Sequence, residues 1–176
     1  MRAEVRYHQK IALFAIFSAI AIVLSILENV LLGALDFLLP GIKPGLANIA
    51  VVLALHYLGG GAAAVVALVK ACASFLATGA ITVLWFSLAG AALSVVGMWL
   101  LARVPAFSLA GVSALGGALS NLGQVIVMIL LSQTVAFLYY LPILTLSGTL
   151  FGLMVGVAAN LIVRRIPRLM GVEARN

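Results

Sequence analysis

The residues with the clearest chemical potential are charged side chains inside long apolar runs of the sequence. Lys70 lies near the middle of one run, and Glu28 lies toward the end of another. A charged side chain at membrane depth is costly unless it is paired or hydrated, so both residues are candidates for ligand binding. A Lys70–Glu28 ion pair is one alternative, and a lysine that reaches the lipid interface or has a structural partner is another.

Uncharged polar side chains form a second candidate group. In the segment 109–131, serines, glycines and Gln124 recur at helical spacing, with Asn121 beside them. Such a face either lines a cavity or forms hydrogen bonds to neighbouring helices. Because Asn121 and Gln124 lie one helical turn apart, we expect them to form a ligand-facing wall. Asn48, in an earlier segment, is expected to close the same cavity.

The connection between the first two apolar runs is a third candidate. It holds Lys43 among prolines and glycines, in the order Leu39-Pro40-Gly41-Ile42-Lys43-Pro44-Gly45. Prolines restrict the backbone and glycines permit sharp reversals. We expect Lys43 either to offer its charge to an anionic ligand or to belong to a rigid connector without a binding role.

The residue types that the sequence contains exclude most catalytic mechanisms. Magnesium–diphosphate enzymes need clustered carboxylates, and the four acidic residues here are scattered: Glu4, Glu28, Asp36 and Glu173. The sequence has no phosphate-binding loop, no metal-ligand spacing for its two histidines and no arrangement of a nucleophile with a base. We therefore expect no catalytic residue, metal ion or cofactor, and we predict that the protein is not an enzyme.

The amino-acid composition indicates what kind of structural element must position these side chains. Hydrophobic residues make up 65% of the 176 and charged residues 8%, and the mean hydropathy is +1.30. Soluble domains carry about 25% charged residues, so this surface must face lipid. With about 20 residues per span, we predict an all-α integral membrane protein, a single transmembrane domain over 1–176 with about six transmembrane helices. Their approximate ranges are 11–32, 45–58, 62–78, 82–102, 109–131 and 139–163.

Charge placement predicts the orientation of the bundle. The net charge is +6, and the bases gather at the two ends of the chain without interleaved aromatic residues, so we expect membrane lipid rather than nucleic acid as the partner. An even number of spans puts both basic ends, and the loop at Arg103, on the same side. Because basic loops stay inside, we predict a multi-pass protein of the cell membrane with cytoplasmic N- and C-termini.

Small residues at helical spacing predict close helix contacts. Gly148, Gly152 and Gly156 recur every four residues in the last segment, and Ala15 and Ala19 have the same spacing in the first. Small residues let helix backbones approach closely in lipid. We expect the glycines to pack inside the bundle. For Ala15 and Ala19, internal packing and a partner helix from another protein are both open.

Several short motifs resemble a known family. They are Pro40–Asn48, Phe86–Gly90, Gly111–Ser113, Ser120–Gln124 and Tyr140–Pro142. Together they resemble the Gx transporter family, which is also labelled heptaprenyl diphosphate synthase component I. That family is similar to the substrate-binding S components of energy-coupling-factor vitamin transporters. This sequence departs from the family pattern at Pro44, where an apolar residue is expected, and at Ser120, where histidine is usual. The serine weakens any argument that position 120 acts by protonation.

The resemblance implies an S-component-like bundle of six helices with a cavity that opens to the outside, capped by the loop after the first helix. It also implies that Ala15 and Ala19 dock on a transporter scaffold and that separate subunits hydrolyse ATP. The function it favours is a membrane-embedded substrate-binding subunit for uptake of a small metabolite.

Two alternative functions stay open at this stage. One is an accessory protein that holds an isoprenoid or quinone-like ligand between its helices beside a prenyl diphosphate synthase. The other is a membrane component of extracytosolic electron transfer. The ligand in the cavity separates these functions from uptake, because a polar metabolite supports transport and a lipid-like tail supports an accessory role.

Overall fold

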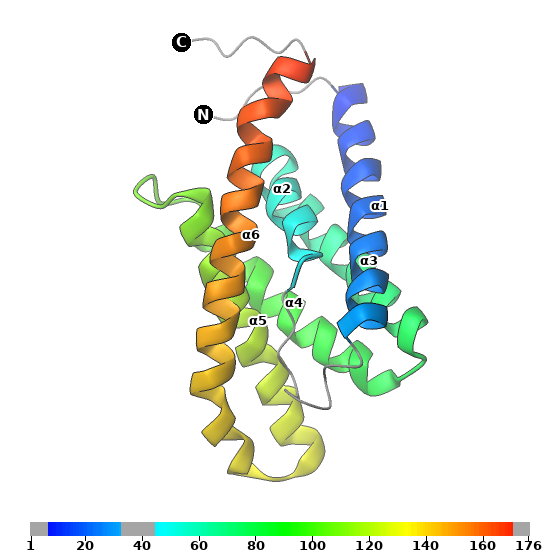
Figure 1. The fold of residues 1–176 in the computed structure, drawn as a ribbon, viewed down its shortest axis with the longest axis vertical. Helices are drawn as coiled ribbons and strands as arrows, with labels where there is room; N and C mark the ends of the chain where they lie inside the picture. Colours follow the sequence, from blue (N-terminus) through cyan, green and yellow to red (C-terminus); the bar gives the residue numbers. More distant parts are fainter. Residues whose placement is uncertain (1–6, 33–44, 171–176) are drawn as a thin grey trace.

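The computed structural model describes residues 7–32 and 45–170, and these residues form an all-helical bundle (Figure 1). Five helices are long and apolar enough to cross a membrane. The protein is therefore a multi-pass membrane protein, as the composition predicts. The elements are α1 (Tyr7–Leu32), α2 (Asn48–Leu58), α3 (Gly60–Thr78), α4 (Ile81–Leu101), α5 (Leu109–Ser132), the short 3₁₀ helix η2 (Val135–Tyr140) and α6 (Leu141–Met170).

The helix that departs most from expectation is α2. The sequence predicts a span over 45–58, whereas α2 has 11 residues and a length of about 17 Å, too short for a hydrocarbon core of about 30 Å. The chain turns at Gly45 (φ 66°) before α2 and again at Gly59 (φ 93°) after it. All six helices are present, but five of them are candidate membrane spans.

The short helix α2 lies inside the bundle. Its residues from Ala50 to Leu55 are all buried, and α2 contacts α1, α3 and α6. At its far end, the Tyr57 hydroxyl donates to the Val163 carbonyl of α6 at 3.4 Å, and the Tyr57 ring stacks on Phe17 of α1. A helix that is apolar on every side is stable in this position because protein surrounds it.

The six helices form two groups of three. Helices α1, α2 and α3 contact one another, α5 packs against both α4 and α6, and the two groups meet through α3–α4 and α2–α6 contacts. The start of α1 and the end of α6 lie at the same end of the bundle, and the α5–α6 connection lies at the other (Figure 1). The space between the groups is where polar side chains can gather without facing lipid.

Backbone contact holds the second group together. A Cβ added to Gly152 of α6 would lie 2.5 Å from the Ser113 carbonyl oxygen of α5, and one added to Gly117 would collide with Gly148. On the opposite side of α5, a Cβ at Gly123 would lie 2.6 Å from the Ala89 carbonyl oxygen of α4. The small-residue pattern therefore produces the close helix contacts expected in a membrane.

Candidate ligand-binding cavity

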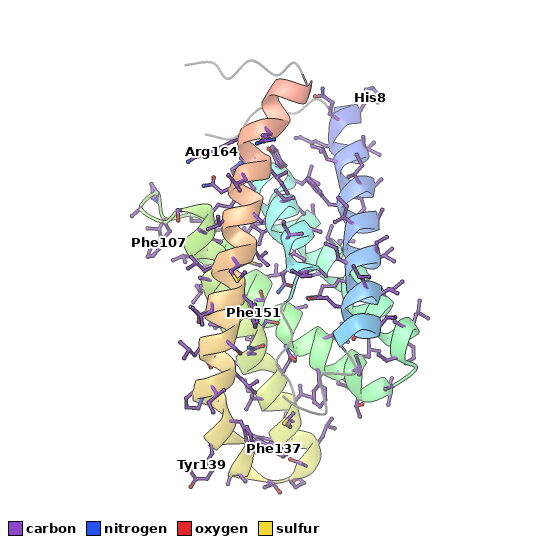
Figure 2. The ribbon with its side chains drawn as sticks, viewed as in Figure 1. His8, Phe107, Phe137, Tyr139, Phe151 and Arg164 are labelled. Atoms are coloured by element: carbon purple, nitrogen blue, oxygen red, sulfur yellow. The ribbon has the colours of Figure 1, made fainter. Side chains whose placement is uncertain are left out.

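A cavity of about 260 Å³ lies between the two groups of helices, and all six helices or their immediate starts contribute to its wall. Its polar lining residues are Glu28, Asn29, Asn48, Lys70, Ser74, Ser87, Ser120, Asn121 and Gln124. Its apolar side chains are Val83, Phe86, Met128 and Phe151. Phe151 lies in the first half of α6, nearer to the α5–α6 connection than to the end of the helix (Figure 2). The cavity thus combines an apolar wall with more polar groups than lipid contact would tolerate.

The structure brings five sequence-predicted candidates to this one cavity: Glu28, Asn48, Lys70, Asn121 and Gln124. They come from α1, α2, α3 and α5, which the sequence alone does not place side by side. Lys43, the sixth candidate, lies outside the described residues. The five described candidates therefore line one cavity.

Glu28 connects α1 to the start of α2. Its carboxylate is 7% exposed and accepts hydrogen bonds from the backbone N–H groups of Leu46 at 2.5 Å and Ala47 at 3.4 Å. N–H groups at a helix start lack partners within the helix, and a negative charge there also interacts favourably with the helix dipole. Glu28 therefore satisfies a helix start that has no side-chain cap of its own.

Lys70 reaches the same stretch of chain from α3. Its Nζ donates to the Asn48 Oδ1 at 2.5 Å, and the Asn48 N–H donates to the Gly45 carbonyl at 2.9 Å. The two charged side chains proposed as an ion pair are thus joined through consecutive residues at the start of α2. The turn at Gly45 places Asn48 where Lys70 can bind it.

A serine pair next to these residues was missed by sequence reasoning. Ser25 Oγ of α1 and Ser74 Oγ of α3 are 2.6 Å apart, and Ser25 also donates to the Lys70 carbonyl at 3.3 Å. Ser25 precedes Glu28 by three positions, and Ser74 follows Lys70 by four. Residues at these spacings share a helix face. The positions of Glu28 and Lys70 in the sequence could therefore have predicted that Ser25 and Ser74 lie beside them.

The two amides of α5 take different positions in the hydrogen-bond network. The Asn121 amide is buried and donates to the Leu144 carbonyl of α6, so it bridges two helices while lining the cavity. The Gln124 amide donates within its own helix, to the Ser120 carbonyl at 3.3 Å and the Asn121 Oδ1 at 3.5 Å. Gln124 is therefore better placed than Asn121 to exchange its partners for a ligand.

The predicted docking residues lie away from the cavity. Ala15 and Ala19 are both exposed on α1, on a helix that also exposes Ile16 and Val23. Within the described residues, no group of three or more histidine, cysteine, aspartate or glutamate side chains could hold a metal ion.

Comparison with protein families decides the classification. A family model described as heptaprenyl diphosphate synthase component I matches residues 17–162, which is most of the chain. The chain belongs to the heptaprenyl diphosphate synthase component I family. The matched region of this family member includes every residue that lines the cavity. Searches of curated proteins and of solved structures give no match.

The different positions of the two amides lead to a prediction. Asn121→Leu removes the donor to Leu144 and should lower the free energy of unfolding by about 0.5–2 kcal/mol, the range of interhelical hydrogen bonds in membranes. Gln124→Leu should change it by less than about 0.5 kcal/mol, because the bonds it loses lie within one helix. Reversible unfolding of both variants in mixed micelles measures the difference. Equal losses would show that the Asn121–Leu144 bond does not hold α5 to α6.

Proposed function

We propose that this member of the heptaprenyl diphosphate synthase component I family is a membrane-embedded substrate-binding subunit, similar to an S component, for uptake of a small metabolite. Separate subunits would supply the energy, and the chain itself would not be an enzyme. The observation that carries the proposal is the convergence of charged and amide side chains from separate helices on one cavity. Polar groups at membrane depth mark ligand pathways when they face the interior of a bundle.

A second candidate is an accessory subunit of a prenyl diphosphate synthase, and the family description favours it. Such a subunit would hold an isoprenoid chain between its helices. The cavity volume of about 260 Å³ lies just below the usual range of small-molecule sites, about 300–1,000 Å³, and a heptaprenyl chain is much larger. The charged and amide side chains of the wall would find no polar partner in a hydrocarbon tail. Both properties favour a compact metabolite.

The two candidates differ in what the purified protein retains. We expect the wild-type protein, extracted in mild detergent, to release a metabolite that mass spectrometry detects. Ser87→Phe adds a ring to the cavity wall and should abolish its retention, because Ser87 lines the cavity. Val96→Phe, on the outward face of the same helix, is the matched control and should retain it. Recovery of phospholipid alone from all three proteins would contradict a substrate-binding role, and an isoprenoid would support the accessory role.

The proposed orientation has both termini in the cytoplasm. Five helices are candidate spans, but the short helix α2 runs between α1 and α3, and the start of α1 and the end of α6 lie at the same end of the bundle (Figure 1). The labelled residues His8 and Arg164 lie near one end of the bundle, and Phe137 and Tyr139 lie at the other (Figure 2). Arginines near one end favour the cytoplasmic side. Single cysteines at Ser132 and Arg165, in a Cys72→Ala background, should react differently with an impermeant maleimide added outside the cell. We expect labelling at position 132, and labelling at position 165 instead would reverse the orientation.

We also propose that Ala15 and Ala19 dock on a transporter scaffold. Both are exposed, and small residues permit close approach of a partner helix. Ala15→Leu and Ala19→Leu should each abolish co-purification with scaffold subunits expressed in the same cells. Val23→Leu is the matched control, because position 23 is exposed on the same helix and already carries a larger side chain. Undiminished co-purification of both alanine variants would contradict docking through this face.

A further inference from the structure

We infer that the cavity takes a compact ligand with no net charge, and that it excludes phosphate esters and diphosphates. This inference deepens the proposed substrate-binding function and rests on it. It concerns the chemical class of the substrate, which the family description does not determine. Two observations support it. The charges of the described cavity wall balance, and the backbone N–H groups at the start of α2 are already bound by Glu28.

The described lining residues balance in charge. Glu28 is the acidic side chain among them and Lys70 is the basic one. Both are held at the start of α2, where Leu46 donates to Glu28 at 2.5 Å and Lys70 donates to Asn48 at 2.5 Å. In a site removed from bulk water, charges interact over longer distances than they do at a surface. A ligand therefore faces one positive and one negative side chain in the described part of the cavity wall, and both charges act on it together.

The same arrangement disfavours a phosphorylated ligand. A phosphate monoester carries about −1.5 to −2 charges at pH 7, more than Lys70 can neutralise, and Glu28 repels it. Helix N-termini are the usual backbone sites for such anions, because their free N–H groups point toward the ligand. Here the N–H groups of Leu46 and Ala47 are already bound by Glu28. The protein's own carboxylate thus occupies the place that a phosphate would need.

The remaining lining groups fit an uncharged polar molecule. Amides such as Gln124 offer both a donor and an acceptor, and Ser87 and Ser120 add hydroxyl groups to the wall. Phe86 and Phe151 supply apolar ring surface. The volume of about 260 Å³ limits the ligand to a compact size. A small heterocycle with hydrogen-bonding substituents and no phosphate combines these properties.

The test begins with the metabolite released by the wild-type protein and absent from Ser87→Phe. We expect its elemental formula, from accurate mass, to contain no phosphorus, and we expect it to pass unretained through both anion exchange and cation exchange at pH 7. In a second measurement, loaded wild-type protein is incubated with isopentenyl diphosphate or inorganic diphosphate at about 1 mM, the upper end of ordinary substrate affinities. After desalting, the protein should retain as much metabolite as it does without these anions.

Each outcome decides between the two proposals. A cavity-dependent metabolite that contains phosphate or binds either ion exchanger overturns the charge inference and leaves the substrate-binding function in place. Displacement of a neutral metabolite by either diphosphate also overturns it. If no metabolite depends on the cavity, the proposed function fails and the charge inference fails with it. A neutral metabolite that diphosphate does not displace supports both.

Discussion

The start of α2 is the constraint on which the rest of the structure depends. Backbone N–H groups inside a membrane bundle cannot form hydrogen bonds with bulk water. A helix that begins there therefore needs hydrogen-bond acceptors from the protein. Glu28 provides them for Leu46 and Ala47. This arrangement explains why a charged residue can lie on a helix that is otherwise apolar. It also places a carboxylate, an amide and a lysine within one small region.

The packing of the other group of helices determines the size of that region. Glycines bring the backbones of α5 and α6 into contact, and three of them, Gly117, Gly148 and Gly152, also line the cavity. A Cβ added at any of the three would meet the facing helix of the α5–α6 pair. The same glycines thus give close backbone contact and form part of the cavity wall. Larger side chains at these positions would separate α5 from α6 before they filled the cavity.

Much of the fold could be predicted from composition and periodicity, because lipid exposure requires long apolar helices. The segment 45–58 was already the shortest of the six predicted spans, but its position inside the bundle could not be predicted. Hydrophobicity is equal for a helix that spans the membrane and one that is buried by its neighbours. The candidate residues were predicted from the cost of polar groups at membrane depth, which is a local property of the sequence. Their hydrogen-bond partners could not be predicted in this way. The bonds from Glu28 to Leu46 and from Lys70 to Asn48 join different helices, and the role of Asn121 depends on a carbonyl of α6.

The contacts that hold α2 also relate ligand binding to the position of this helix. Lys70 and Asn48 line the cavity and are bound to each other. The lysine ammonium has three N–H groups, so a ligand can accept one while Asn48 keeps another, or it can take the place of Asn48. In the first case the ligand adds a contact to the start of α2, and in the second it removes one. Either exchange changes the interactions that hold α2 between α1 and α6. Because a ligand shifts a conformational equilibrium only through contacts that differ between the states, the Lys70–Asn48 bond is one contact through which a ligand of the proposed kind would act on the bundle.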